Sequence, residues 1–141
     1  MIRWGTRTNV PGIVGMDLKP QTFEDVVILS PAGRIDHNTA GEFQAALMTH
    51  VEDSGVSGTK IVLDLGGIVY MSSVGLRALM VAAKQSKEDE GTIVIAAMQA
   101  DMKEIFEISR FHFVFKTFGS VSEALIEISE TAAKAYQAAE D

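Results

Sequence analysis

The residues best suited to chemistry are two adjacent serines, Ser72 and Ser73, which stand between an apolar stretch and a helical pattern. A serine hydroxyl can act as a nucleophile, accept a phosphoryl group, or cap the free N–H groups at the start of a helix. Apolar residues follow the pair at helical spacing, at Leu76, Leu79, Met80 and Ala83. We therefore expect a helix to begin at the serines, where capping alone would also explain them.

The sequence around Ser73 does not favour a hydrolase or another enzyme. A nucleophile elbow needs Gly-x-Ser-x-Gly, whereas Met71 takes the place of the first glycine and only Gly75 matches. None of the three histidines stands in a pattern that indicates a general base, and no phosphate-binding Gly-x-x-x-x-Gly-Lys-Ser/Thr loop is present. The chain has no cysteine and no Cys or carboxylate pattern near His112, so the sequence also predicts no metal site and no cofactor. We expect a protein that is not an enzyme.

The opposite side of the helix carries a second, smaller apolar strip. Val74, Ala78 and Val81 share this face, and Arg77 flanks it. If the first stripe packs on a sheet, the second faces water beside the serines and could receive a partner protein. Scattered exposed apolar residues are common, so the pattern alone leaves a docking surface and an ordinary helix face as alternatives.

Composition and charge limit the kinds of partner. The 141 residues suit a single domain that can bury a core without disulfides or metals. A net charge of −7 argues against a nucleic-acid surface, which needs concentrated positive charge. No apolar run approaches the ~20 residues of a membrane span, and the N-terminus does not resemble a signal peptide. We expect a cytoplasmic protein that acts through other proteins.

Apolar periodicity predicts alternating strands and helices. An N-terminal hairpin is expected from Met16–Lys19 and Phe23–Ser30, after which Pro31 should limit further pairing and Gly33 should let the backbone turn. A helix should follow a capping box at Thr39 and Glu42 and end at Ser54-Gly55. Beyond it we expect the strand Lys60–Leu65, a break at Gly66-Gly67, the helix after the serines, and the strand Thr92–Ala97 in parallel with the first. A helix capped by Asp101 and running through Ser109, an edge strand Phe111–Phe115, and a helix capped by Ser120 complete the order.

These elements predict one α/β domain over residues 16–132, with a mixed sheet of four to five strands and helices mostly on one face. Residues 1–15 read as a flexible arm and residues 133–141 as a frayed tail. Trp4 in the arm either docks loosely or anchors a partner or a second copy of the chain, which leaves a homodimer open.

Two motifs resemble those of a known family. Tyr70-Met71-Ser72-Ser73-Val74-Gly75-Leu76 resembles the signature of STAS domains of the bacterial anti-sigma factor antagonist type, an aromatic and a methionine followed by Asp-Ser-Ser/Thr-Gly-Leu. Upstream, Gly33 to Ala40 resembles the Gly-x-Leu-Asp loop of the same family. The resemblance spans residues 16–129. In one departure, Ser72 replaces the acidic residue that normally precedes the phosphorylated serine, so that Ser72 becomes a competing acceptor.

The resemblance implies a partner-switching protein of mixed-sheet fold. Unphosphorylated, it would bind an anti-sigma factor that is also a serine kinase and so free a sigma factor. Phosphorylation at Ser73 would release it, and a serine phosphatase would reset it. Asp36 would lie beside the phosphorylation site and Gly75 would permit a close approach, while the docking surface is expected at Val74, Arg77, Ala78 and Val81. The alternative is a non-switching scaffold subunit of a signalling assembly or of a lipid or anion transport system.

Overall fold

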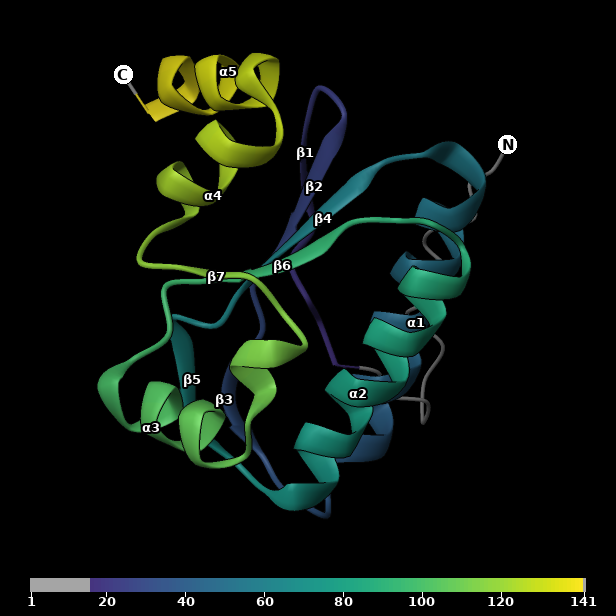
Figure 1. Ribbon diagram of the computed structural model, residues 1–141, viewed down its shortest axis with the longest axis vertical. Coiled ribbons are helices and arrows are strands. Elements are labelled where there is room, and N and C mark those ends of the chain that lie inside the picture. Colours follow the sequence, from purple (N-terminus) through teal and green to yellow (C-terminus); the bar gives the residue numbers. More distant parts are fainter. Residues whose placement is uncertain (1–15, 141) are drawn as a thin grey trace.

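The computed structural model of the protein describes residues 16–140, which are organised around a five-stranded sheet (Figure 1). The strand order is β1-β2-β4-β6-β7, with β1 (Gln21–Phe23), β2 (Val26–Leu29), β4 (Lys60–Asp64), β6 (Ile93–Ala96) and β7 (Thr117–Phe118). β1 pairs with β2 antiparallel, whereas β2, β4, β6 and β7 pair in parallel. The sheet is therefore mixed, as predicted, and the expected parallel pairing of β4 with β6 is confirmed.

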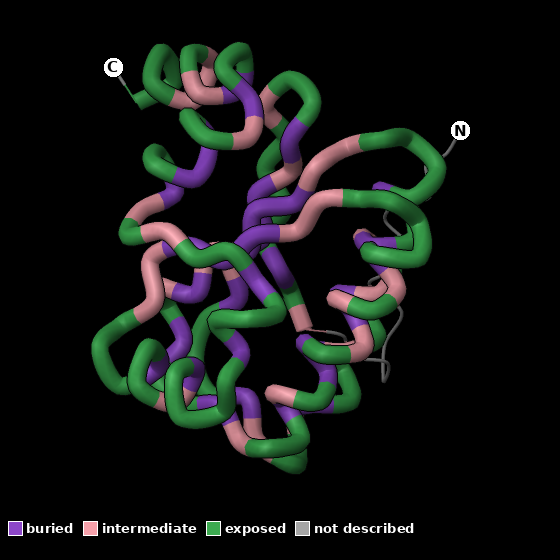
Figure 2. The backbone as a smooth tube through the Cα atoms, in the orientation of Figure 1, coloured by how far each residue is buried: buried purple, intermediate pink, exposed green. Residues whose placement is uncertain are grey.

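The central strands are apolar on both sides because helices cover both faces of the sheet (Figure 2). Leu63 and Ile95 belong to one core with α1 (Ala40–Ser57), α2 (Ser73–Glu88) and α3 (Ala100–Ile108). Val62 and Val94 face a second core with α4 (Val121–Ile128) and α5 (Glu130–Glu140). Within residues 16–140, helices α1, α2 and α3 thus share one face of the sheet, and α4 and α5 cover the other.

A second, two-stranded parallel sheet was not predicted. It consists of β3 (Ala32–Ile35) and β5 (Gly67–Met71). We expected Gly33 to let the backbone turn after a strand, but Gly33, with a φ of +95°, lies inside β3. The register shifts after it, because Gly33 pairs with Ile68 and Arg34 with Tyr70, which leaves Val69 of β5 as the extra residue of a bulge. Gly67, expected in a break, begins the partner strand. Both motifs found in the sequence lie at the ends of these two strands.

The N-terminal hairpin exists, but the predicted strand limits are wrong. Its turn falls at Glu24 and Asp25, inside the stretch expected to be one continuous strand, and Glu24 adopts a φ of +55° there. Leu18 lies outside the hairpin strands. Its carbonyl oxygen accepts a hydrogen bond of 2.6 Å from the N–H of Ser30, and its side chain is buried.

Helix α1 differs from its prediction at both ends. The expected capping box is wrong, because the Thr39 side chain makes no capping hydrogen bond and is engaged elsewhere. The helix continues past Ser54-Gly55 to Ser57, where Gly58 ends it with a φ of +80°. The Gly58 N–H donates to the Ser54 carbonyl oxygen at 2.8 Å, which is a glycine C-cap.

The predicted edge strand Phe111–Phe115 is also wrong. Phe111–Phe113 form a short 3₁₀ helix, η2, and the edge strand is β7 instead. Phe111 and Phe115 are four residues apart and both pack on Phe106, with ring centroids 5.4 and 6.3 Å away, so their spacing is helical. The preceding helix α3 begins at Ala100, so that Asp101 lies inside its first turn instead of capping it, and the helix ends at Ile108.

The C-terminal segment is more ordered than expected. Ser120 caps α4 as predicted, its hydroxyl accepting a hydrogen bond of 3.1 Å from the Glu123 N–H. The segment expected to fray from residue 133 continues instead as helix α5 to Glu140. Tyr136 packs edge-on against Phe23 of β1, with ring centroids 5.3 Å apart, which holds α5 against the sheet. The predicted flexible arm, with Trp4, lies outside the described residues.

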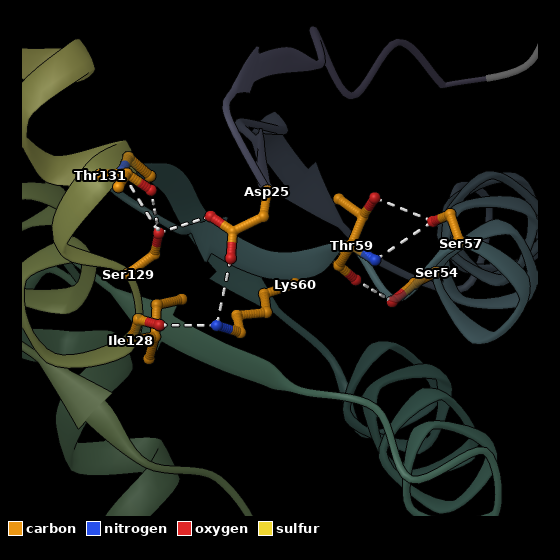
Figure 3. A network of polar contacts seen from close by, with 9 residues as sticks. Asp25, Ser54, Ser57, Thr59, Lys60, Ile128, Ser129 and Thr131 are labelled. Carbon is orange, nitrogen blue, oxygen red and sulfur yellow. Dashed lines mark hydrogen bonds and ion pairs between the residues drawn. The ribbon is translucent and has the colours of Figure 1, made fainter.

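Ser129 joins α4 and α5 to the sheet (Figure 3). Its hydroxyl donates to the Asp25 carboxylate at 2.5 Å and accepts from the Ala132 N–H at 3.2 Å. The Lys60 ammonium group, from β4, contacts the same carboxylate at 3.2 Å and donates to the Ile128 carbonyl oxygen at 2.9 Å. This network fixes the junction of the two helices.

Candidate functional site

The two serines have different surroundings at the start of α2. Ser72 is the N-cap, is half-buried, and its hydroxyl accepts a hydrogen bond of 3.3 Å from the Gly75 N–H. Ser73 is the first helical residue and is exposed. The predicted helix start is therefore confirmed. Capping occupies Ser72 and leaves the hydroxyl of Ser73 accessible from solvent.

Parallel pairing of β3 with β5 brings the two sequence motifs together. Ile35 is the register partner of Met71, so the two strands end at the same edge of their sheet. The N–H of Ser72 donates to the Ile35 carbonyl oxygen at 2.8 Å. Asp36 directly follows Ile35, and its loop consequently adjoins the start of α2.

The Asp36 loop is held by its own side chains. The Asp36 carboxylate accepts a hydrogen bond of 2.9 Å from the Asn38 N–H, and this bond is the main reason that the carboxyl pKa lies below its usual value. Asp36 therefore carries a negative charge at neutral pH. Thr39 was read only as a helix cap, but its hydroxyl accepts from the Asp36 N–H at 2.9 Å and donates to the Arg34 carbonyl oxygen at 3.0 Å.

Gly75 is buried where α2 crosses the ends of β3 and β5. A Cβ atom at this position would lie 2.6 Å from the Met71 Cγ and 2.8 Å from the Ile35 Cγ2, closer than nonbonded carbon atoms tolerate. The expected close approach thus takes place inside the molecule. The absence of a side chain at Gly75 is what lets the helix start settle on the two strands.

The predicted second strip of α2 is only partly at the surface. Val74 is 45% exposed, Arg77 is exposed and Val81 is half-buried. The placement of Ala78 is wrong, because its side chain is fully buried in the core shared with α1, which packs beside α2. Conversely, Met80 was expected inside but is 41% exposed.

The sequence does not predict the exposed patch beside the serines, because it does not predict β5 to be a strand. Val69 is 60% and Tyr70 is 38% exposed on β5, while Ile68 and Met71 face the core. The Arg34 guanidinium lies 4.4 Å from the centroid of the Tyr70 ring, a cation–π contact between register partners. Together with Val74, these side chains form what we call the β5 patch (Arg34, Val69, Tyr70 and Val74).

Within residues 16–140, no cluster of three or more His, Cys, Asp or Glu side chains is arranged to hold a metal ion. None of the helices in this part of the chain is both long and apolar enough to cross a membrane.

Comparison with known proteins identifies a matching family and a related protein. The model of the STAS domain family matches residues 17–124. A Bordetella bronchiseptica protein, BtrV, named as a candidate anti-sigma factor antagonist, is 32% identical over 105 residues, which cover 74% of this chain and 88% of BtrV.

Two solved structures show the same fold. The first, from Thermotoga maritima and also titled as a candidate anti-sigma factor antagonist, has a TM-score of 0.72 at 19% identity and covers 79% of this chain and 93% of its own. The second is the Bacillus cell fate determinant SpoIIAA in its phosphorylated form. Its TM-score is 0.57 at 15% identity, over 78% of this chain and 97% of its own.

Proposed function

The chain belongs to the STAS domain family, and on that basis we propose that it is an anti-sigma factor antagonist that works by partner switching. In its unphosphorylated form it binds an anti-sigma factor that is also a serine kinase, which frees a sigma factor. Phosphorylation at Ser73 releases it, and a serine phosphatase restores the binding form. The relative named for this role, at 32% identity, supports the general function.

The accessibility of Ser73 is the observation that carries the proposal. A kinase must reach the acceptor oxygen, and Ser73 is exposed at the first position of α2. Ser72 is the poorer acceptor, because its half-buried hydroxyl already caps the helix. This difference favours Ser73 over its neighbour although both are serines.

A phosphoryl group on Ser73 changes binding without disturbing the fold. It adds about −1.5 to −2 charges at a helix N-terminus, where the helix dipole and free N–H groups favour an anion. Asp36, which is ionised and belongs to the adjoining loop, adds further negative charge. A partner that covers this site would meet a hydrated dianion. A loss of ~3 kcal/mol of binding free energy would weaken the complex more than a hundredfold.

The partner surface is proposed to be the β5 patch together with Arg77 and Val81. Three exposed apolar side chains of the patch lie within a few positions of Ser73 on both sides in the sequence. Aromatic and arginine side chains are the residues most often dominant in protein interfaces, and the stacked pair of Arg34 and Tyr70 offers both. A phosphoryl group on Ser73 would lie at the edge of this surface.

The test compares the unmodified protein with variants in binding to the cognate anti-sigma factor. With that kinase and ATP, mass mapping should find one phosphate on Ser73, and Ser73→Ala should abolish it. Ser73→Ala should keep binding, whereas Ser73→Asp should lose it. Ser122→Asp, at an exposed position in the first turn of α4, is the matched control for added charge and should bind normally. Equal binding by all variants would favour the non-switching scaffold instead.

A further inference from the structure

An open groove runs beside the second half of α2, at the end of this helix that lies away from Ser73. Its volume is about 730 Å³, which falls in the range of pockets that bind small organic ligands, ~300–1,000 Å³. The apolar part of its wall comes from α2, β6 and the segment at η2, through Met80, Ala83, Ile93, Val94, Phe113 and Val114. The side chain of Phe113 is 75% exposed, that of Met80 is 41% exposed and that of Val114 is 40% exposed. Exposed apolar side chains around one hollow are typical of a ligand-binding surface.

Three lysines give this groove a positive rim. Lys84, Lys87 and Lys116 line it and no carboxylate does, although the whole chain carries a net charge of −7. Lys116 makes only a long contact of 4.0 Å with Glu127, and both side chains are largely exposed. Such a contact contributes little, so the charge of Lys116 stays available to a ligand. Charge complementarity therefore favours an anionic occupant.

A buried hydroxyl supports the same conclusion. Ser86, on the groove wall, is only 6% exposed, and its hydroxyl oxygen would lie 3.1 Å from a Cβ atom at Gly91, another residue of the wall. Buried polar side chains are nearly always hydrogen-bonded. The head of an anionic ligand could accept a hydrogen bond from this hydroxyl.

We propose that the groove binds a free single-chain amphiphile with an anionic head, of the fatty carboxylate type. The chain lies on the apolar wall between Met80 and Phe113, and the carboxylate meets the lysines. A bilayer is the less suitable source of such a ligand, because a chain of net charge −7 is repelled by an anionic membrane surface. The inference concerns a site separate from Ser73 and does not depend on the switching role.

The test uses dodecanoate as the probe and isothermal titration calorimetry as the measurement. We expect saturable binding at one site, with a Kd on the order of tens of micromolar and below the concentration at which the probe forms micelles. Octanoate should bind more than about tenfold more weakly, because it buries four fewer methylene groups. Dodecyltrimethylammonium should not bind, because its head is cationic.

Charge-reversal variants locate the site. Lys84→Glu with Lys87→Glu should weaken dodecanoate binding at least about tenfold through unfavourable charge. Lys103→Glu with Lys134→Glu changes the net charge equally at exposed positions outside the groove, and should leave the Kd unchanged. Phe113→Ser should weaken binding without altering the fold, as checked by circular dichroism, because its side chain is mostly exposed.

Backbone amide shifts in NMR spectra complete the test. Dodecanoate should shift resonances in residues 80–87 and 111–116 and leave Ser72 and Ser73 unmoved. The proposal is overturned by non-saturable binding, by equal affinity for the cationic amphiphile, by unchanged binding in the Lys84 and Lys87 double variant, or by shifts that map elsewhere. Two further arms use phosphatidylglycerol vesicles and an acidic amphipathic peptide. If either of these binds at the groove while dodecanoate does not, the occupant is a membrane or a protein and the proposal fails.

Discussion

The N–H of Ser72 donates a hydrogen bond of 2.8 Å to the carbonyl oxygen of Ile35. This bond extends the pairing of β3 with β5 by one residue and joins two loops that are more than thirty positions apart in the sequence. Asp36 directly follows Ile35 in the chain, and Ser73 directly follows Ser72. The position of the proposed phosphorylation site therefore depends on a small sheet and on the loop that ends β3.

Thr39→Val should destabilise the protein by removing the hydroxyl that holds the Asp36 loop. The substitution leaves the Asp36 N–H and the Arg34 carbonyl oxygen without their partner. We expect the free energy of unfolding in urea to fall by about 1–2 kcal/mol, since both groups are only partly covered. Thr49→Val is the control, because the Thr49 hydroxyl donates only to the exposed carbonyl oxygen of Ala45 inside α1. The free energy of unfolding of this variant should change by less than about 0.5 kcal/mol. Equal losses in both variants would contradict the role given to Thr39.

Gly75→Ala should destabilise the protein although alanine is the better helix former. A methyl group would lie 2.6 Å from the Met71 Cγ and 2.8 Å from a branch of Ile35, which overpacks the contact between α2 and the small sheet. Overpacking costs about 1–3 kcal/mol, against a gain of about 1 kcal/mol in helix propensity. A net loss should appear in urea unfolding.

The control for this variant is Gly41→Ala in the first turn of α1. A Cβ atom there meets nothing within 4 Å, so the substitution should stabilise by about 0.4–1 kcal/mol. A stabilised Gly75→Ala variant would show that α2 can move away from Ile35, and would contradict the close packing described above.

The fold was predictable where a local pattern and its tertiary setting agree. β4 and β6 are apolar on both faces, the Ser72 cap begins α2, and the Ser120 cap begins α4, and each of these features was expected from sequence. The apolar periodicity of these strands and the serines that cap these helices can both be recognised in the local sequence. The mixed sheet followed from them.

The remaining features depend on neighbours that the sequence does not display. Ala78 lies on an apolar strip that looks solvent-facing, but α1 packs there and buries it. Phe111 and Phe115 look like part of a strand until Phe106 supplies the surface on which both pack. Strands β3 and β5 contain glycines, which usually end strands. These two segments become strands because each pairs with the other. The β5 patch was missed for the same reason.

Ser129→Ala should destabilise the protein in a pH-dependent way. The Ser129 hydroxyl is the main cause of the lowered pKa of Asp25, with Lys60 as a further one. A carboxyl whose folded pKa lies below its unfolded value, near 3.8, stabilises the fold above that value, and this contribution is lost as the pH falls through the folded pKa. The variant also loses the cap that accepts the Ala132 N–H. We expect a loss of about 1–2 kcal/mol at pH 7.

The pH dependence separates the two effects of this substitution. In Ser129→Ala the folded pKa of Asp25 moves back toward its ordinary value. The loss in free energy of unfolding, measured in urea at each pH, should therefore be smaller at pH 2.5 than at pH 7. Ser120→Ala removes a cap that contacts no carboxylate, and its cost should be similar at the two values. An NMR titration of the Asp25 carboxyl should show its pKa rising in Ser129→Ala alone. An unchanged pKa would mean that the network in Figure 3 does not hold Asp25.

Tyr70→Ser should weaken binding of the proposed anti-sigma partner while leaving stability nearly unchanged. Tyr70 is 38% exposed and carries the Arg34 guanidinium over its ring, so truncation removes an aromatic anchor and frees the cation. We expect a loss of about 2 kcal/mol, or roughly thirtyfold in Kd, as measured by calorimetry. Phe113→Ser truncates an exposed aromatic side chain at η2, outside the β5 patch, and should bind the partner normally. Normal binding by Tyr70→Ser would move the interface away from β5.

Ser73→Asp should lose the partner and yet remain as stable as the unmodified protein. The new carboxylate stands at the first position of α2, next to the N–H groups that have no partner inside the helix, and the helix dipole favours a negative charge there by about 0.3–1 kcal/mol. Repulsion from Asp36 opposes this gain, so we expect the free energy of unfolding to change by less than about 0.5 kcal/mol at physiological ionic strength. The same measurement in 1 M salt should show an even smaller change. If Ser73→Asp instead unfolds the start of α2, seen as lost protection of its amides from hydrogen exchange, release of the partner would follow from local unfolding rather than from charge at an intact surface.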